Sequence, residues 1–111
     1  MPRRHVRFDS DLKATILTRP GDRAIGEAHV SNVSPAGLLL ERLEAHLSRD
    51  SAVWVEIADA TTRGRVGLIG RVVWTEDDRA GVDIEAMFPH HRDRFGDLLE
   101  RLAFSELAEL H

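Results

Sequence analysis

Residues 64–86, which read GRVGLIGRVVWTEDDRAGVDIEA, decide the fold class of this chain. The first half of the stretch is rich in Val and Ile, and this composition predicts a long β-strand. Gly67 and Gly70 interrupt it, so we expect bends or bulges at these two positions. The polar residues Glu76 to Arg79 are typical of a hairpin loop. The alternation over residues 82–86 then predicts a second strand that returns beside the first.

Four upstream segments share this strand-like pattern. In each, apolar residues alternate with polar ones or form a short apolar run, which predicts β-strands. The expected strands cover residues 12–16, 25–33, 38–40 and 53–57. Turn-forming residues separate the first three: residues 19–22 (RPGD) follow the first strand, and residues 32–37 (NVSPAG) connect the second to the third. The chain is therefore expected to form six short strands in succession.

The pattern changes after Pro89, a residue type that suits the first turn of a helix. The apolar residues that follow recur at helical spacing: Phe95, Leu98, Leu99, Leu102, Leu107 and Leu110. This stripe predicts an amphipathic C-terminal α-helix over about residues 90–110, packed by its apolar side. Six short strands followed by one helix favour a small antiparallel barrel or sandwich, which the helix caps or crosses.

The composition is that of one globular domain. The chain has 111 residues, of which 42% are hydrophobic and 31% charged, and this profile is not that of a disordered chain. It contains no cysteine, which excludes a disulfide framework, a thiolate zinc site and a cysteine nucleophile. No apolar stretch follows the basic N-terminus and no run approaches the length of a membrane span, so we expect a cytoplasmic protein without membrane insertion.

The charge is negative overall but basic at the N-terminus. The formal net charge is −4, and a globally acidic chain is poorly suited to bind a nucleic-acid polymer or an anionic membrane. Arg3, Arg4, His5 and Arg7 nevertheless precede the first acidic residue, Asp9. This local basic density suits a small anion better than a long polymer.

No constellation of residues indicates an active site. Ser34 has no histidine near it in the sequence to act as its base, and Asp77 and Asp78 lie in the expected hairpin loop, where acids are usually solvated. His90 and His91 are adjacent, so we expect them to form an exposed helix start. No histidine spacing matches a metal-binding motif. We therefore expect a protein that is not an enzyme and that holds no metal or cofactor.

Two polar clusters remain as candidates for a binding site. The first is the N-terminal run of arginines, whose planar guanidinium groups can pair with a phosphate or with the O6/N7 edge of guanine. The second is the turn at residues 32–37. There Asn32 and Ser34 offer short hydrogen-bonding groups, and Gly37 allows a close backbone approach or a positive φ.

Both clusters resemble the signatures of a known family. R-x-x-x-R at residues 3–7, followed by N-x-S-x-x-G at residues 32–37, resembles the paired RxxxR and (D/N)xSxxG motifs of PilZ domains, the bacterial receptors for cyclic di-GMP. Residues 70–74 and 80–82 are similar to the family's later V-x-W and G-V strands. The resemblance covers nearly the whole chain and implies a six-stranded antiparallel β-barrel with a C-terminal α-helix.

The resemblance also implies which residues bind the ligand. They are Arg3, Arg4, Arg7, Asn32, Ser34 and Gly37. The arginines would lie on an arm that wraps cyclic di-GMP and pairs with its phosphates and guanine edges. The asparagine and the serine would hydrogen-bond a guanine, and the glycine would make room for it.

This interpretation divides the chain into a flexible basic arm, residues 1–11, and a barrel with its helix, residues 12–111. Ordering of the arm on ligand binding would then signal to a protein partner. The alternative is a PilZ-like adaptor that binds no nucleotide and acts by protein–protein interaction. A barrel that binds single-stranded nucleic acid is disfavoured, because Trp54 and Trp74 are expected in the core or at the barrel mouth and the net charge is negative.

Overall fold

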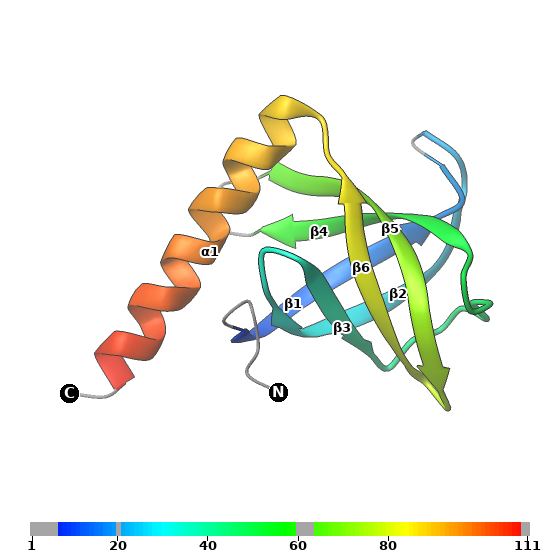
Figure 1. The fold of residues 1–111 in the computed structure, drawn as a ribbon, viewed down its shortest axis with the longest axis horizontal. Helices are drawn as coiled ribbons and strands as arrows, with labels where there is room; N and C mark the ends of the chain where they lie inside the picture. Colours follow the sequence, from blue (N-terminus) through cyan, green and yellow to red (C-terminus); the bar gives the residue numbers. More distant parts are fainter. Residues whose placement is uncertain (1–6, 20, 60–63, 110–111) are drawn as a thin grey trace.

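Six β-strands close into a barrel, and one α-helix follows them (Figure 1). The structure, a computed structural model, describes residues 7–19, 21–59 and 64–109. Its elements are β1 (Phe8–Leu17), β2 (Ala24–Val33), β3 (Gly37–Glu41), β4 (Ala52–Asp59), β5 (Gly64–Glu76), β6 (Arg79–Ala86) and α1 (Pro89–Glu109). The strands follow the order β1-β2-β3-β6-β5-β4 around the barrel, and each neighbouring pair is antiparallel. The predicted barrel with its C-terminal helix is confirmed, and the sandwich is excluded.

The first strand starts earlier than the alternation of apolar residues indicated. β1 begins at Phe8, whereas the pattern predicted a start at Leu12. The expected flexible arm covered residues 1–11, and its last four residues, 8–11, are therefore part of the sheet. Residues 1–6 lie outside the described residues.

The polar start of β1 is held by β2. Asp9 lies opposite Asn32, and Ser10 Oγ donates a hydrogen bond to the backbone oxygen of Val30 at 2.6 Å. Asp9 and Asp11 are exposed while their neighbours are half-buried, so the period of two continues to the start of the strand. The sequence concealed this because Asp9, Ser10 and Asp11 are all polar, so the stretch between Phe8 and Leu12 carries no hydrophobic contrast.

The interior of the barrel is filled by the inward-facing side chains of its strands. The largest of the fully buried side chains are Ile16, Leu40, Ile57, Leu68, Val30, Val33, Val55, Val66, Val72 and Val82. α1 runs past the strand ends on one side of the barrel (Figure 1) and contacts β5 and β1. Its residues Phe95 and Leu98 are buried and join the core cluster, which confirms the predicted apolar stripe for this part of the helix.

The start of α1 is attached to the barrel by His91, which corrects the expectation of an exposed helix start. The imidazole lies 6.1 Å from the Trp54 ring, centroid to centroid, and its Nδ1 accepts a hydrogen bond from the backbone N–H of Gly67 at 3.0 Å. Burial, His90 and Arg94 lower the pKa of His91. The neutral ring required for this acceptor is therefore favoured.

Two glycines of β5 have different structural roles. Gly70 lies at a register shift between β5 and β6, as predicted for a bulge. Gly67 keeps a regular pairing with Glu56 of β4, so no bulge forms there between β5 and β4. A side chain on Gly67 would instead collide with the indole of Trp54, and the glycine is needed because this ring lies against the strand.

Candidate functional site

The candidate site is a cavity of about 220 Å³ on the outer face of the barrel, where β3, β6 and β5 adjoin. The residues of interest in its lining are Arg7, Ser34, Gly37, Trp74, Gly81 and Asp83. Its volume lies below the range of about 300–1,000 Å³ that is usual for drug-sized ligands. The cavity therefore suits one planar ring rather than a whole dinucleotide.

The turn between β2 and β3 is organised by Ser34. Its hydroxyl is buried, with the residue 5% exposed, and accepts hydrogen bonds from the backbone N–H groups of Ala36 at 3.1 Å and Gly37 at 3.0 Å. It also lies 3.4 Å from the carbonyl oxygen of Gly37, to which the Ser34 backbone N–H donates at 2.9 Å. These contacts use both acceptor sites of the hydroxyl and its donor. Ser34 lines the cavity, and its hydrogen bonds fix the loop that forms the cavity wall.

Gly37 permits the close packing of β3 on β6. A Cβ atom placed on Gly37 would lie 2.7 Å from the backbone oxygen of Val82. No side chain fits there without a shift of the main chain. The prediction that this glycine allows a close backbone approach is confirmed, and the reason is strand packing.

Asn32 lies at the margin of the cavity and does not line it. Ser31 forms a bulge in β2 opposite β3, since Val30 pairs with Leu40 and Asn32 pairs with Leu39. The extra residue shifts the alternation, so that Val30 and Val33 both face the core and Asn32 is left half-buried on the outer side. Leu39 does line the cavity, and its partner Asn32 is thus one strand away.

The structure describes one of the three predicted arginines. Arg7, the residue before β1, is exposed and lines the cavity together with the turn that Ser34 organises. Two motifs that are far apart in the sequence therefore meet, as their pairing in the sequence suggested. Arg3 and Arg4 lie outside the described residues.

Trp74 lines the cavity, although its sequence context predicted a place in the core or at the barrel mouth. Its indole lies on the outer face, over Gly81, and 38% of the residue is exposed. The guanidinium of Arg79 lies 5.8 Å from the ring centroid. The indole N–H has no hydrogen-bond partner among the described residues. An aromatic surface and a hydrogen-bond donor are therefore available beside the cavity.

A signal for the position of Trp74 was present in the sequence. The hairpin between β5 and β6 turns at Asp77 and Asp78, and counting outward from that turn places Trp74 opposite Gly81. A large ring opposite a glycine commonly lies over it, because the missing side chain leaves space. A register shift between Val72 and Trp74, which no simple alternation predicts, completes the outward orientation.

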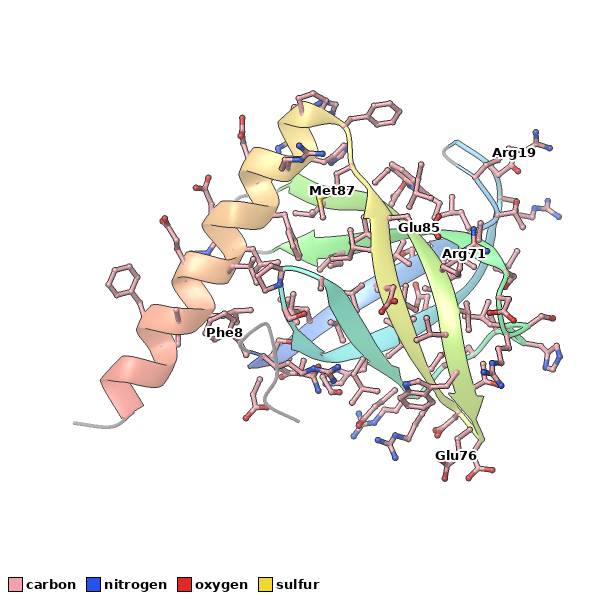
Figure 2. The ribbon with its side chains drawn as sticks, in the orientation of Figure 1. Phe8, Arg19, Arg71, Glu76, Glu85 and Met87 are labelled. Carbon is pink, nitrogen blue, oxygen red and sulfur yellow. The ribbon has the colours of Figure 1, made fainter. Side chains whose placement is uncertain are left out.

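Asp83 places a carboxylate at the edge of the cavity. It lies on the outer face of β6, directly opposite Gly37 on β3 and Arg71 on β5. Arg71 is occupied elsewhere: its guanidinium pairs with Glu85, side by side in Figure 2, and its Nη1 donates to the backbone oxygen of Asp50 at 2.8 Å. A hydrogen bond and the charge of Glu85 raise the pKa of Arg71. The Asp83 side chain makes no hydrogen bond or ion pair with a described residue.

The described part of the chain offers neither a cluster of metal ligands nor a membrane-spanning helix. Within residues 7–19, 21–59 and 64–109, no three histidine, aspartate or glutamate side chains gather closely enough to hold a metal ion. The one helix described there is not apolar enough over its length to cross a membrane.

Comparisons with known proteins identify the fold. The family model of the PilZ domain matches residues 2–105. The Bacillus subtilis inhibitor of motility MotI/DgrA superposes with a TM-score of 0.71 at 13% identity, over 97% of this chain and 52% of its own, so this chain spans about half its length. The PilZ domain of CeSA from a cellulose-synthesizing bacterium superposes with a TM-score of 0.64 at 12% identity, over 91% of this chain and 98% of its own. No curated protein matches.

Proposed function

Because the chain belongs to the PilZ domain family, we propose that it is a receptor for cyclic di-GMP, a binding module with no catalysis of its own. The observation that carries the proposal is the convergence of Arg7, the turn at Ser34 and the exposed ring of Trp74 on one cavity. An arginine and an aromatic surface are the two groups that recognise a nucleotide base and its phosphate.

In this proposal one guanine enters the cavity against the exposed part of the Trp74 indole. Stacking of a base on an aromatic side chain contributes about 1–3 kcal/mol. Arg7 pairs with a phosphate or with the O6/N7 edge of the base, and a bidentate pair contributes about 1–3 kcal/mol of discrimination. A micromolar complex requires about 8 kcal/mol. The rest of this binding free energy would come from Arg3 and Arg4, through contacts with the phosphates and the second base.

The second motif supports the site in two ways. Ser34 keeps the turn in shape, since loss of its hydroxyl would leave the N–H groups of Ala36 and Gly37 without partners. Asn32, at the margin of the cavity, would hydrogen-bond a part of the ligand that extends past Leu39. The direct serine–guanine hydrogen bond that the resemblance implied is less favoured, because the hydroxyl is already fully engaged.

Titration calorimetry of cyclic di-GMP into the whole chain, with GTP as a control, tests the proposal. We expect saturable binding to the wild type and none to Arg7→Ala, whose circular dichroism should be unchanged because Arg7 is exposed and precedes β1. Arg23→Ala serves as the matched control, since this exposed arginine lies outside the cavity lining and its loss changes the net charge equally. Absence of heat and of thermal stabilisation at about 100 μM ligand would refute the proposal.

The output of the module is proposed to be contact with a protein partner. Ordering of the N-terminal segment over the ligand would change the surface that the partner meets. The exposed ring of Phe88, 52% exposed and stacked on His90, favours a second candidate, an adaptor that binds its partner without nucleotide. Capture of the same partner in equal yield with and without cyclic di-GMP would favour the adaptor.

A further inference from the structure

We propose that Asp83 reads the Watson–Crick edge of the bound guanine and makes the cavity selective for guanine over adenine. This inference rests on the proposed function, because it assigns a specificity role within the same cavity. It concerns a residue of β6 that belongs to neither sequence motif.

The position of Asp83 is open toward the cavity. Its direct partner on β3 is Gly37, and a Cβ atom on that glycine would lie 3.6 Å from Oδ1 of Asp83. Since Gly37 has no side chain, nothing on β3 stands between the carboxylate and the cavity. Gly81, two residues earlier on the same face of β6, carries the Trp74 ring. Residues two apart on a strand are separated by about 7 Å, so a base stacked on the ring has its edge within reach of Asp83.

The Asp83 carboxylate also forms no ion pair with the arginine opposite it on the neighbouring strand. Arg71 lies directly across from it on β5, where it could form a cross-strand ion pair. The guanidinium turns instead to Glu85 and to the backbone oxygen of Asp50. Asp83 therefore keeps both oxygens available as acceptors, and no described residue uses them.

The chemistry of the two purines separates them at such a group. The Watson–Crick edge of guanine presents two adjacent donors, N1–H and the N2 amino group, which match the two oxygens of a carboxylate in a bidentate, charge-assisted pair. Adenine presents the lone pair of N1 at the same place, which a carboxylate repels. A negative group beside a binding site for an anionic ligand weakens binding by repulsion. A carboxylate that takes part in recognition must therefore offset this repulsion by accepting hydrogen bonds from the ligand.

The ordinary interpretation of Asp83 is a solvated carboxylate on an exposed strand. The two interpretations predict opposite signs for its neutralisation. If Asp83 is only solvated, Asp83→Asn removes repulsion and binding of an anion stays equal or becomes tighter. If Asp83 reads guanine, the same change weakens binding.

The test is titration of cyclic di-GMP, cyclic di-IMP, which lacks the N2 amino groups, and cyclic di-AMP into the wild type, Asp83→Asn and Asp83→Ala. We expect both variants to bind cyclic di-GMP about 10- to 100-fold more weakly, as for loss of a bidentate base contact. They should bind cyclic di-AMP no more weakly than the wild type does. The preference for cyclic di-GMP over cyclic di-IMP should be clear in the wild type and absent in Asp83→Ala.

Asp78→Asn is the matched control, because it removes the same charge from the exposed hairpin turn outside the cavity lining and should leave all three affinities unchanged. Cyclic di-GMP binding by Asp83→Asn that equals or exceeds that of the wild type would overturn this inference and leave the proposed function standing. Equal losses for the guanine and adenine ligands would also overturn it. A wild type that binds no cyclic di-GMP would overturn both.

Discussion

Trp54 and Trp74 both lie over a glycine of a neighbouring strand, but only one of them is covered. Trp54 packs against Gly67 and is 4% exposed, while Trp74 packs against Gly81 and is 38% exposed. The difference is made by α1, whose His91 and the preceding Phe88 lie against the Trp54 ring, with centroid distances of 6.1 and 6.2 Å.

The two indole N–H groups differ in the same way. Trp54 donates its hydrogen bond to Glu56 Oε1 at 3.0 Å, whereas the N–H of Trp74 has no partner among the described residues. A buried indole normally finds a partner, and an indole at a recognition surface can supply its donor to a ligand. The same local arrangement therefore stabilises the fold at one place and leaves a surface for binding at the other.

Removal of each ring is the strongest test of this difference. Trp54→Ala leaves a cavity beneath α1 and is expected to lower the free energy of unfolding by about 3–5 kcal/mol. Trp74→Ala should lower it by only about 1 kcal/mol, because much of the ring is already exposed, and should weaken cyclic di-GMP binding by about 10- to 100-fold through lost stacking.

Urea denaturation and ligand titration on both variants measure these effects. Trp74→Phe is the control, since it keeps an aromatic surface and should retain part of the affinity. Equal losses of stability in the two alanine variants would contradict the assignment of different roles.

The glycines beneath the rings give a smaller effect of the same kind. A methyl group on Gly67 collides with an indole that α1 holds in place, so Gly67→Ala is expected to cost about 1–3 kcal/mol of stability. A methyl group on Gly81 also meets an indole, but the Trp74 ring can swing toward solvent. Gly81→Ala should therefore keep most of its stability and lose affinity for the ligand.

Thermal unfolding, together with Trp fluorescence, distinguishes the two glycine variants. The emission of Gly81→Ala should shift toward that of a more exposed indole, because Trp74 moves outward. A Gly81→Ala protein that binds cyclic di-GMP as the wild type does would show that the position of Trp74 over the strand is unimportant for binding.

The fold was predictable because its signals are local and repeated. Alternation, turn residues and the helical stripe from Phe95 onward each predict the element in which they occur, and the resemblance to a known family implied the closure of six strands into a barrel. The start of β1 at Phe8 was missed since polar residues carry no such alternation.

The candidate site was predictable only in the parts that carry a motif. Arg7, Ser34 and Gly37 meet at the cavity as their motifs suggested. Trp74 and Asp83 were missed, because their outward orientation depends on pairing across strands and on a register shift in β5. Counting outward from the hairpin turn places Trp74 opposite Gly81, but the register shift in β5 and the pairing of Asp83 with β3 are properties of the closed barrel that no short window of sequence contains.

The weakest expected effect is a loss of stability at low pH through His91, which packs against the buried ring of Trp54. Burial lowers the pKa of His91 below its ordinary value of 6.5, with further contributions from His90 and Arg94 that outweigh the opposing influences of Arg65 and Glu56. The unfolded chain then binds a proton near pH 6.5 while the folded chain resists it, so this contribution to stability is complete above pH 6.5 and declines as the pH falls below it. Protonation also removes the acceptor for the Gly67 N–H, and the start of α1 loses a contact with β5.

We expect the wild type to unfold at a lower temperature below pH 6.5, with a smaller decline in His91→Gln, whose amide oxygen can still accept a hydrogen bond. His46→Gln, an exposed histidine away from α1, is the control and should retain the wild-type decline. If His91→Gln loses stability on acidification as steeply as the wild type, then protonation of His91 does not weaken the packing of α1 over Trp54.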